Sequence, residues 1–156
     1  MVAAAGGSTL TLHSLRTRAL GVTPLRICLG FALLGLARSV GAARGPAYLA
    51  FALGVAGIVF VIFNDPRARF LRREVEPLPF PSGAEVAPPW RQTLAASLPS
   101  TVGVTALALV ALAFRPALAA LLAGVCAGLG VASLLSLGRI DPALHVDPKT
   151  NLIYRR

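Results

Sequence analysis

The feature that most constrains the fold is an apolar stretch from Thr93 to Gly138, in which the one charged residue is Arg115, followed by Pro116. A membrane-spanning helix needs about 20 mostly apolar residues. As one continuous helix, this stretch would be more than about 60 Å long, roughly twice the hydrocarbon core of a bilayer. An interior proline removes a backbone hydrogen bond, and an arginine in the middle of a membrane is costly. The stretch therefore predicts two spans, 93–114 and 116–138, joined by a very short turn.

The composition also favours a membrane protein. Of the 156 residues, 56% are hydrophobic and only 13% are charged. Soluble domains carry about 25% charged residues, because a surface in water needs them. The chain has the length of one domain. We therefore expect a single integral membrane domain.

Two further spans are predicted in the first half of the chain. The segment 46–63 contains no charged residue, whereas the segment 25–43 contains Arg26 and Arg38. These two arginines lie about 18 Å apart along a helix, and each side chain can extend toward the nearer headgroup layer. The segment 25–43 is therefore long enough to form a short first span.

The distribution of basic residues distinguishes three spans from four. With four spans and a cytoplasmic N-terminus, only Arg38, Arg44 and Arg115 lie outside, and the other twelve of the 15 basic residues lie inside. If 25–43 did not span, the ratio would be nine to six. Basic residues are enriched on the cytoplasmic side of membrane proteins. The sequence therefore predicts four spans with both termini in the cytoplasm. The strong preference for arginine over lysine is associated with GC-rich bacteria, so the expected location is the bacterial inner membrane.

The predicted fold is an all-α, integral membrane four-helix bundle made of two helical hairpins. Its spans are 25–43, 46–63, 93–114 and 116–138, with a cytoplasmic loop at 64–92 and a short basic tail at 139–156. The loop segment 76–90 carries five prolines and predicts an extended link without a fold of its own. In the tail, turn-forming residues at 147–151 lie between two β-prone stretches and predict a small hairpin.

Two stripes recur every four positions in the last two spans. The hydroxyl stripe is Thr93, Ser97, Thr101 and Thr105, and the small-residue ridge is Ala120, Gly124, Gly128, Ala132 and Ser136. Such a ridge lets two helix backbones approach closely. We predict that the two stripes face each other, with Thr105 opposite Gly124 and Thr101 opposite Gly128. Hydroxyl groups can also bond to carbonyls of their own helix, and the alternative function of the hydroxyl stripe is a polar path for a solute.

Basic side chains supply the candidates for contact with an anion. A helix stop at Asn64-Asp65-Pro66 is followed by Arg67, Arg69, Arg72 and Arg73. We expect Asn64 to adopt a left-handed cap conformation and the segment 66–76 to form an interfacial helix. Its arginines would then contact the phosphates of anionic lipids. Arg38 either extends to the outer phosphates or forms a buried site for an anionic lipid or substrate.

The sequence contains no catalytic, metal-binding or cofactor-binding motif, and its predicted spans contain no Asp, Glu or His. Its basic residues flank apolar runs and therefore predict contact with a membrane rather than with nucleic acid. Cys28 and Cys126 lie inside apolar runs and are expected to behave as small hydrophobic residues.

These observations lead to a non-catalytic function as the first expectation. The protein would be a scaffold, assembly factor or accessory subunit, in contact with anionic lipid or with a membrane or cytoplasmic protein partner. The alternative is a small permease or channel that acts as an oligomer. A membrane enzyme that uses the cytoplasmic carboxylates is the third hypothesis.

Overall fold

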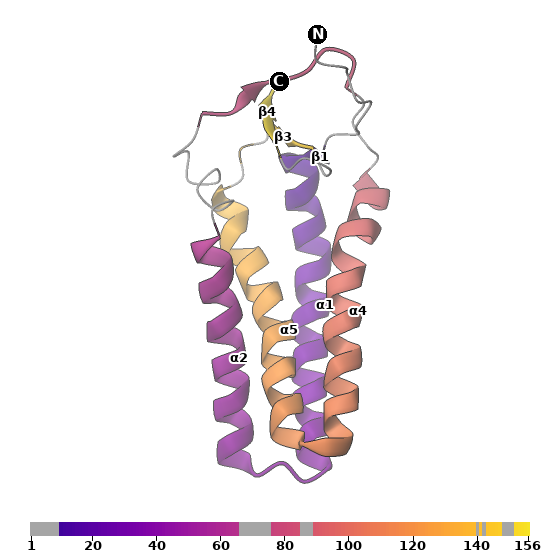
Figure 1. Ribbon diagram of the computed structural model, residues 1–156, viewed down its shortest axis with the longest axis vertical. Coiled ribbons are helices and arrows are strands. Elements are labelled where there is room, and N and C mark those ends of the chain that lie inside the picture. Colours follow the sequence, from indigo (N-terminus) through magenta and orange to yellow (C-terminus); the bar gives the residue numbers. More distant parts are fainter. Residues whose placement is uncertain (1–9, 66–75, 85–88, 140, 142, 148–151) are drawn as a thin grey trace.

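The computed structural model describes residues 10–65, 76–84, 89–139, 141, 143–147 and 152–156, with side chains from Leu20 in the first helix and from Leu98 in the third. Four long helices in this part of the chain run side by side as a bundle (Figure 1). They are α1 (Leu12–Ser39), α2 (Arg44–Asn64), α4 (Pro89–Phe114) and α5 (Pro116–Ser136), and a 3-10 turn (Leu137–Arg139) follows α5. The predicted helical bundle is therefore confirmed.

Three of the described helices are long and apolar enough to cross a membrane. They are Leu20–Ser39 within α1, the whole of α2, and the whole of α5. In α4, the described apolar part is shorter and covers Leu98–Phe114. These lengths and compositions indicate a membrane protein.

The first helix ends earlier than the predicted limit of residue 43. Gly41 has a φ of 113°, which is a conformation that favours glycine. The N–H of Gly41 donates to the carbonyl of Arg38 (3.2 Å), and the N–H of Ala42 donates to the carbonyl of Ala37 (3.1 Å). This pair of hydrogen bonds is the Schellman motif, which ends α1 at Ser39. At its other end, α1 begins at Leu12, well before the predicted span.

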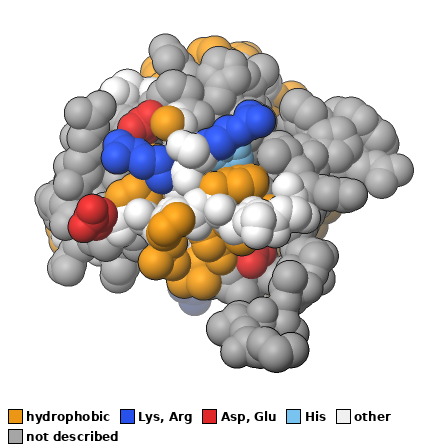
Figure 2. Space-filling view, turned by 90° about the horizontal axis from the view of Figure 1, so that it is seen from above, with side chains coloured by type: hydrophobic (Ala, Val, Ile, Leu, Met, Phe, Trp, Pro, Cys, Tyr) orange, Lys and Arg blue, Asp and Glu red, His pale blue; other side chains and the backbone are white. Residues whose placement is uncertain are grey.

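The bundle has two different ends (Figure 1). The connection end holds residues 40–43, which join α1 to α2, and Arg115, which joins α4 to α5. The sheet end holds the four strands. Seen from the sheet end, basic, acidic and hydrophobic side chains are interspersed (Figure 2).

Helix α5 is the central element, because it contacts α1, α2 and α4 (Figure 1). Its close contacts occur at glycines. A Cβ atom on Gly30 in α1 would lie only 2.8 Å from the carbonyl oxygen of Ala123 in α5. A Cβ atom on Gly54 in α2 would collide with the carbonyl oxygen of Leu121. The small residues thus allow both neighbouring backbones to pack directly on α5.

The interior of the bundle consists mainly of small side chains. Ala37, Ala108 and Ala120 are fully buried. Many large apolar side chains instead face outward, and Phe60 and Phe114 are 68% and 79% exposed. Soluble proteins place most of their large apolar side chains inside. The observed arrangement suits a bundle surrounded by lipid, where close backbone contact rather than hydrophobic burial holds helices together.

A small four-stranded sheet lies at the sheet end of the bundle. Its strands are β1 (Leu10–Thr11), β2 (Leu78–Pro79), β3 (Leu144–Val146) and β4 (Ile153–Arg155), in the order β1-β3-β4-β2. Strands β3 and β4 pair antiparallel, with His145 opposite Tyr154, and this confirms the predicted hairpin in the tail.

The Pro-rich loop takes part in this sheet. Strand β2 pairs parallel with β4, and the N–H of Phe80 donates to the carbonyl of Arg155 (2.7 Å). The predicted extended conformation is present at Leu78–Pro79, and the sequence did not predict its pairing with the tail. An extended proline-containing segment leaves some backbone groups free for pairing, and the C-terminal strand binds them.

The end of α2 also differs from the prediction. Asn64 is the last helical residue, and its Nδ2 donates to the carbonyl of Phe60 (2.9 Å). The chain leaves the helix at Asp65 with a φ of −60° and a ψ of 130°. The predicted left-handed cap at Asn64 is therefore wrong. The predicted interfacial helix, with Arg67, Arg69, Arg72 and Arg73, lies outside the described residues.

Candidate functional site

A buried arginine connects α1 to α4. Arg26 is 8% exposed, and its Nε donates a hydrogen bond to Oγ1 of Thr101 (2.9 Å). Its Nη2 donates to Oγ of Ser100 (3.0 Å). The expectation that Arg26 extends toward a headgroup layer is therefore wrong. Two hydroxyl groups of α4, on buried Thr101 and on exposed Ser100, offer acceptors, so the guanidinium is turned toward them.

Two more polar side chains lie near Arg26, where α1 packs against α5. Thr23 is buried, and its Oγ1 lies 3.5 Å from the carbonyl oxygen of Gly130, to which it donates. The buried Sγ of Cys126 donates to the carbonyl of Arg26 (3.7 Å). We refer to Thr23, Arg26, Ser100, Thr101 and Cys126 as the Arg26 cluster. It lies where α1, α4 and α5 meet.

A glycine allows α1 to pack closely on α5 beside the cluster. A Cβ atom at Gly130 would lie 2.8 Å from Cγ1 of Ile27 and 3.0 Å from the carbonyl oxygen of Thr23. A larger residue at this position would push α1 away from α5. The position of Arg26 relative to α4 thus depends on a small residue in α5.

Both helices that Arg26 joins contain an interior proline near the cluster. These are Pro24 in α1 and Pro99 in α4. An interior proline removes one helical hydrogen bond and leaves a carbonyl to be satisfied in another way. An ionisable side chain within the helices of a membrane protein is a candidate functional site. Pro24 and Pro99 were the features of the sequence that could have indicated this site. In the count of basic residues, Arg26 was considered only as a charge near a membrane surface.

Gly124 and Gly128 of the small-residue ridge do not face Thr105 and Thr101 of the hydroxyl stripe as predicted. The nearest atoms to a Cβ at Gly124 belong to Phe51, and those at Gly128 belong to Val55 and Ile58, all in α2. The predicted partner of the ridge is therefore wrong, because α5 presents these glycines to α2 and a different face to α1. The rest of the ridge consists of Ala120 and Ala132, which are fully buried, and Ser136, whose hydroxyl donates to the carbonyl of Ser133 (2.9 Å).

The described hydroxyls of α4 bond to other partners. Thr101 accepts from Arg26, and Oγ1 of Thr105 donates to the carbonyl of Thr101 in its own helix (2.7 Å). The side chains of Thr93 and Ser97 lie outside the described part of the structure. For Thr105, the prediction of a bond within its own helix is confirmed.

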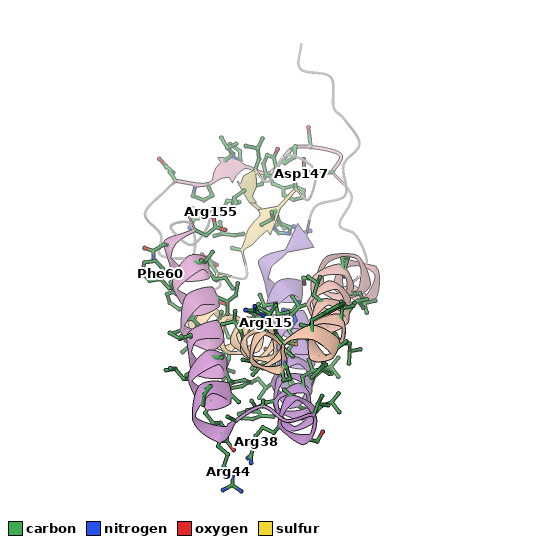
Figure 3. The ribbon with its side chains drawn as sticks, turned by 60° about the horizontal axis from the view of Figure 1, so that its bottom comes forward. Arg38, Arg44, Phe60, Arg115, Asp147 and Arg155 are labelled. Carbon is green, nitrogen blue, oxygen red and sulfur yellow. The ribbon has the colours of Figure 1, made fainter. Side chains whose placement is uncertain are left out.

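Arg38 lies in the last turn of α1, at the connection end (Figure 3). Its Nη1 donates to the hydroxyl of Tyr48 (2.7 Å), and its Cζ lies 5.4 Å from the centroid of the Tyr48 ring. Its Nε is buried and has no hydrogen-bond partner among the described residues. Arg44 and Arg115 are exposed at the same end of the bundle (Figure 3). This end therefore presents positive charge from three arginines.

His145 lies in the sheet and is 2% exposed. Its Nδ1 lies 3.3 Å from the carbonyl oxygen of Ala143, and its Nε2 has no hydrogen-bond partner among the described residues. The ring of Phe80 contacts it edge to face, with 4.8 Å between centroids. Through this contact, the Pro-rich loop packs against the C-terminal tail. The described residues include no group of three His, Cys, Asp or Glu side chains placed to hold a metal ion.

Comparisons of the chain with protein-family models, with curated proteins and with solved structures find no match. The functional conclusions therefore depend on the bundle, the Arg26 cluster and the two ends of the molecule.

Proposed function

We propose that this protein is a non-catalytic, multi-pass protein of the bacterial inner membrane that acts as a scaffold, assembly factor or accessory subunit. In this proposal, four helices cross the membrane and the sheet end lies in the cytoplasm. The sheet end then holds the site that a protein partner contacts.

The observation that carries the proposal is the pairing of β2 with β4. This pairing joins the Pro-rich loop to the C-terminal tail, and β1 brings the start of α1 into the same sheet. Three segments far apart in the sequence thus pair in one sheet at the end of the apolar bundle (Figure 1). Exposed Leu78 and Leu152 lie at this end together with exposed Arg155 and Arg156. Apolar and arginine side chains of this kind are common where proteins bind one another.

The interior of the bundle supports a structural role. Close packing at Gly54, Gly124 and Gly128 fills the contact between α2 and α5 with backbone atoms. Thr105 uses its hydroxyl within its own helix rather than toward a solute path. These features favour helix packing over transport.

The proposal is tested by co-purification of a tagged full-length protein from the membranes of its own cells. Ile153 is buried in the sheet and the neighbouring Leu152 is exposed, so Ile153→Ser and Leu152→Ser are a matched pair. We expect a protein that co-purifies with the wild type to be lost from Ile153→Ser, because a buried hydroxyl disrupts the sheet. Retention of every co-purifying protein by Ile153→Ser would contradict the proposal.

A permease or channel is the second candidate, and the Arg26 cluster favours it. A buried arginine between two proline-containing helices offers a positive charge to an anionic solute. A cysteine at Thr101, in a chain without Cys28 and Cys126, would then react with a small water-soluble thiol reagent from at least one side. Protection of this cysteine from both sides would exclude an aqueous path to the cluster.

A further inference from the structure

The connection end carries positive charge that no carboxylate offsets within the described part of the chain. Its arginines are Arg38, Arg44 and Arg115. The described acidic residues all belong to segments at the sheet end, namely Asp65, Glu76, Asp141 and Asp147. A surface with charge of one sign attracts ligands of the opposite sign.

Tyr48 fixes the position of the Arg38 guanidinium. The hydroxyl of Tyr48 accepts the hydrogen bond from Nη1, and the guanidinium lies within cation–π distance of the ring. The Tyr48 side chain is itself 50% exposed. Half-exposed tyrosines are enriched at the headgroup level of membranes, where the ring contacts apolar chains and the hydroxyl contacts polar groups. Arg38 is therefore held beside the ring of Tyr48, and among the described residues its Nη2 has no hydrogen-bond partner.

Arg44 lies at the same end of the bundle as this pair. It is the first residue of α2, one helical turn before Tyr48, and it is exposed, while Arg115 lies on the connection between α4 and α5 (Figure 3). The preceding residue, Ala43, supplies no side-chain hydrogen bond to the start of α2. The first backbone N–H groups of α2 therefore add positive character beside the two guanidinium groups.

We propose that Arg38, Arg44 and Tyr48 bind a phosphate group, and that its source is the headgroup of an anionic phospholipid. Guanidinium groups donate paired hydrogen bonds that match phosphate oxygens. The choline group of a zwitterionic lipid would find no carboxylate among the described residues at this end. The site therefore selects phosphatidylglycerol over phosphatidylcholine. This inference rests on the membrane insertion in the proposed function.

Native mass spectrometry of the full-length protein tests the site. The protein is released from micelles that contain equal amounts of phosphatidylglycerol and phosphatidylcholine, and the bound lipids are compared. We expect the wild type to prefer phosphatidylglycerol, and the double variant Arg38→Gln/Arg44→Gln to lose that preference by about threefold or more. The matched control, Arg155→Gln/Arg156→Gln, removes the same charge from the sheet end and should keep the preference.

Further variants separate the local site from general charge. Tyr48→Phe keeps the ring but removes the hydroxyl that holds Arg38, so a partial loss of preference is expected. Arg115→Gln removes the third arginine of the same end and should have a smaller effect than Arg38→Gln/Arg44→Gln. Circular dichroism checks that each variant folds. If Arg38→Gln/Arg44→Gln does not fold, Tyr48→Phe and Arg38→Lys decide the question, because both keep the charge.

The outcomes are distinct. Full preference in a folded Arg38→Gln/Arg44→Gln variant, or an equal loss in the sheet-end control, overturns the site. Displacement of bound lipid by inorganic phosphate, without any preference between the two lipids, identifies free phosphate as the ligand and overturns the lipid source. Extraction of the protein from membranes by alkaline carbonate contradicts the proposed function itself. A protein that resists extraction but shows no lipid preference contradicts only this inference.

Discussion

The Nε of Arg26 in α1 donates a hydrogen bond of 2.9 Å to Oγ1 of Thr101 in α4, although 75 positions separate the two residues in the sequence. This bond places a charged group inside an assembly of apolar helices. A buried charge that loses an acceptor is costly, whereas replacing both partners with apolar groups costs little.

This asymmetry gives the first prediction. Thr101→Val removes the acceptor and retains the shape, so it should lower the free energy of unfolding by about 1–3 kcal/mol. Arg26→Met/Thr101→Val should be more stable than Thr101→Val alone, because the charge is also removed. Reversible unfolding in mixed micelles measures both. Strict additivity of Arg26→Met and Thr101→Val would show that the two side chains are not coupled.

The second prediction concerns the contact between α2 and α5. Gly124→Ala should lower the free energy of unfolding by about 1–3 kcal/mol, because the added methyl group collides with the backbone of Phe51. Gly57→Ala is the matched control in α2, since nothing lies within 4 Å of a Cβ atom there. It should leave stability unchanged or raise it by up to about 1 kcal/mol. The same micelle unfolding assay compares them, and equal destabilisation by both substitutions would contradict the packing described for Gly124.

The third prediction concerns the contact of Phe80 with His145. Removing an aromatic pair costs about 1 kcal/mol, so Phe80→Ala should release the loop and raise its rate of proteolytic cleavage about fivefold. Limited proteolysis of the protein in micelles, with cleavage sites identified by mass spectrometry, measures this rate. The control is Ser82→Ala, which changes an exposed residue of the same loop. Equal cleavage of Phe80→Ala and the wild type would mean that the ring contact does not hold the loop.

The fourth prediction tests the proposed orientation. In a chain without Cys28 and Cys126, single cysteines are placed at Val40 in the connection end and at Leu152 in the sheet end, both of which are exposed. A membrane-impermeant maleimide added to intact cells should label Val40→Cys. It should label Leu152→Cys only after the cells are made permeable. Labelling of Leu152→Cys alone in intact cells would reverse the proposed orientation.

Local features of the sequence were enough to predict the helices. The apolar run and its interruption at Arg115-Pro116 placed the boundary between α4 and α5 where the structure has it. The turn residues at 147–151 predicted the pairing of β3 with β4. Such features depend on hydropathy, on the missing N–H of proline and on turn chemistry, all of which act over a few residues.

The sequence pattern was less informative about contacts between helices, because each such contact involves a second helix. A four-residue repeat predicted that Gly124 and Gly128 form a surface for close packing, and the structure places them in close contact with another helix. The repeat could not identify that helix. Helix α5 has three neighbours, and a ridge of small residues can pack against any of them. The assumption that the next helix in the sequence is the partner led to the wrong pairing.

By itself, the sequence determined a membrane-type helical bundle with a hairpin in its tail, because length, apolar composition and turn residues are local properties. The tertiary structure alone decided that Arg26 is buried against Thr101, that the ridge packs on α2, and that residues 78–80 pair with the C-terminal strand. Each of these contacts joins segments far apart in the sequence. Their formation depends on which acceptors, small residues and free backbone groups the other helices and strands bring into reach.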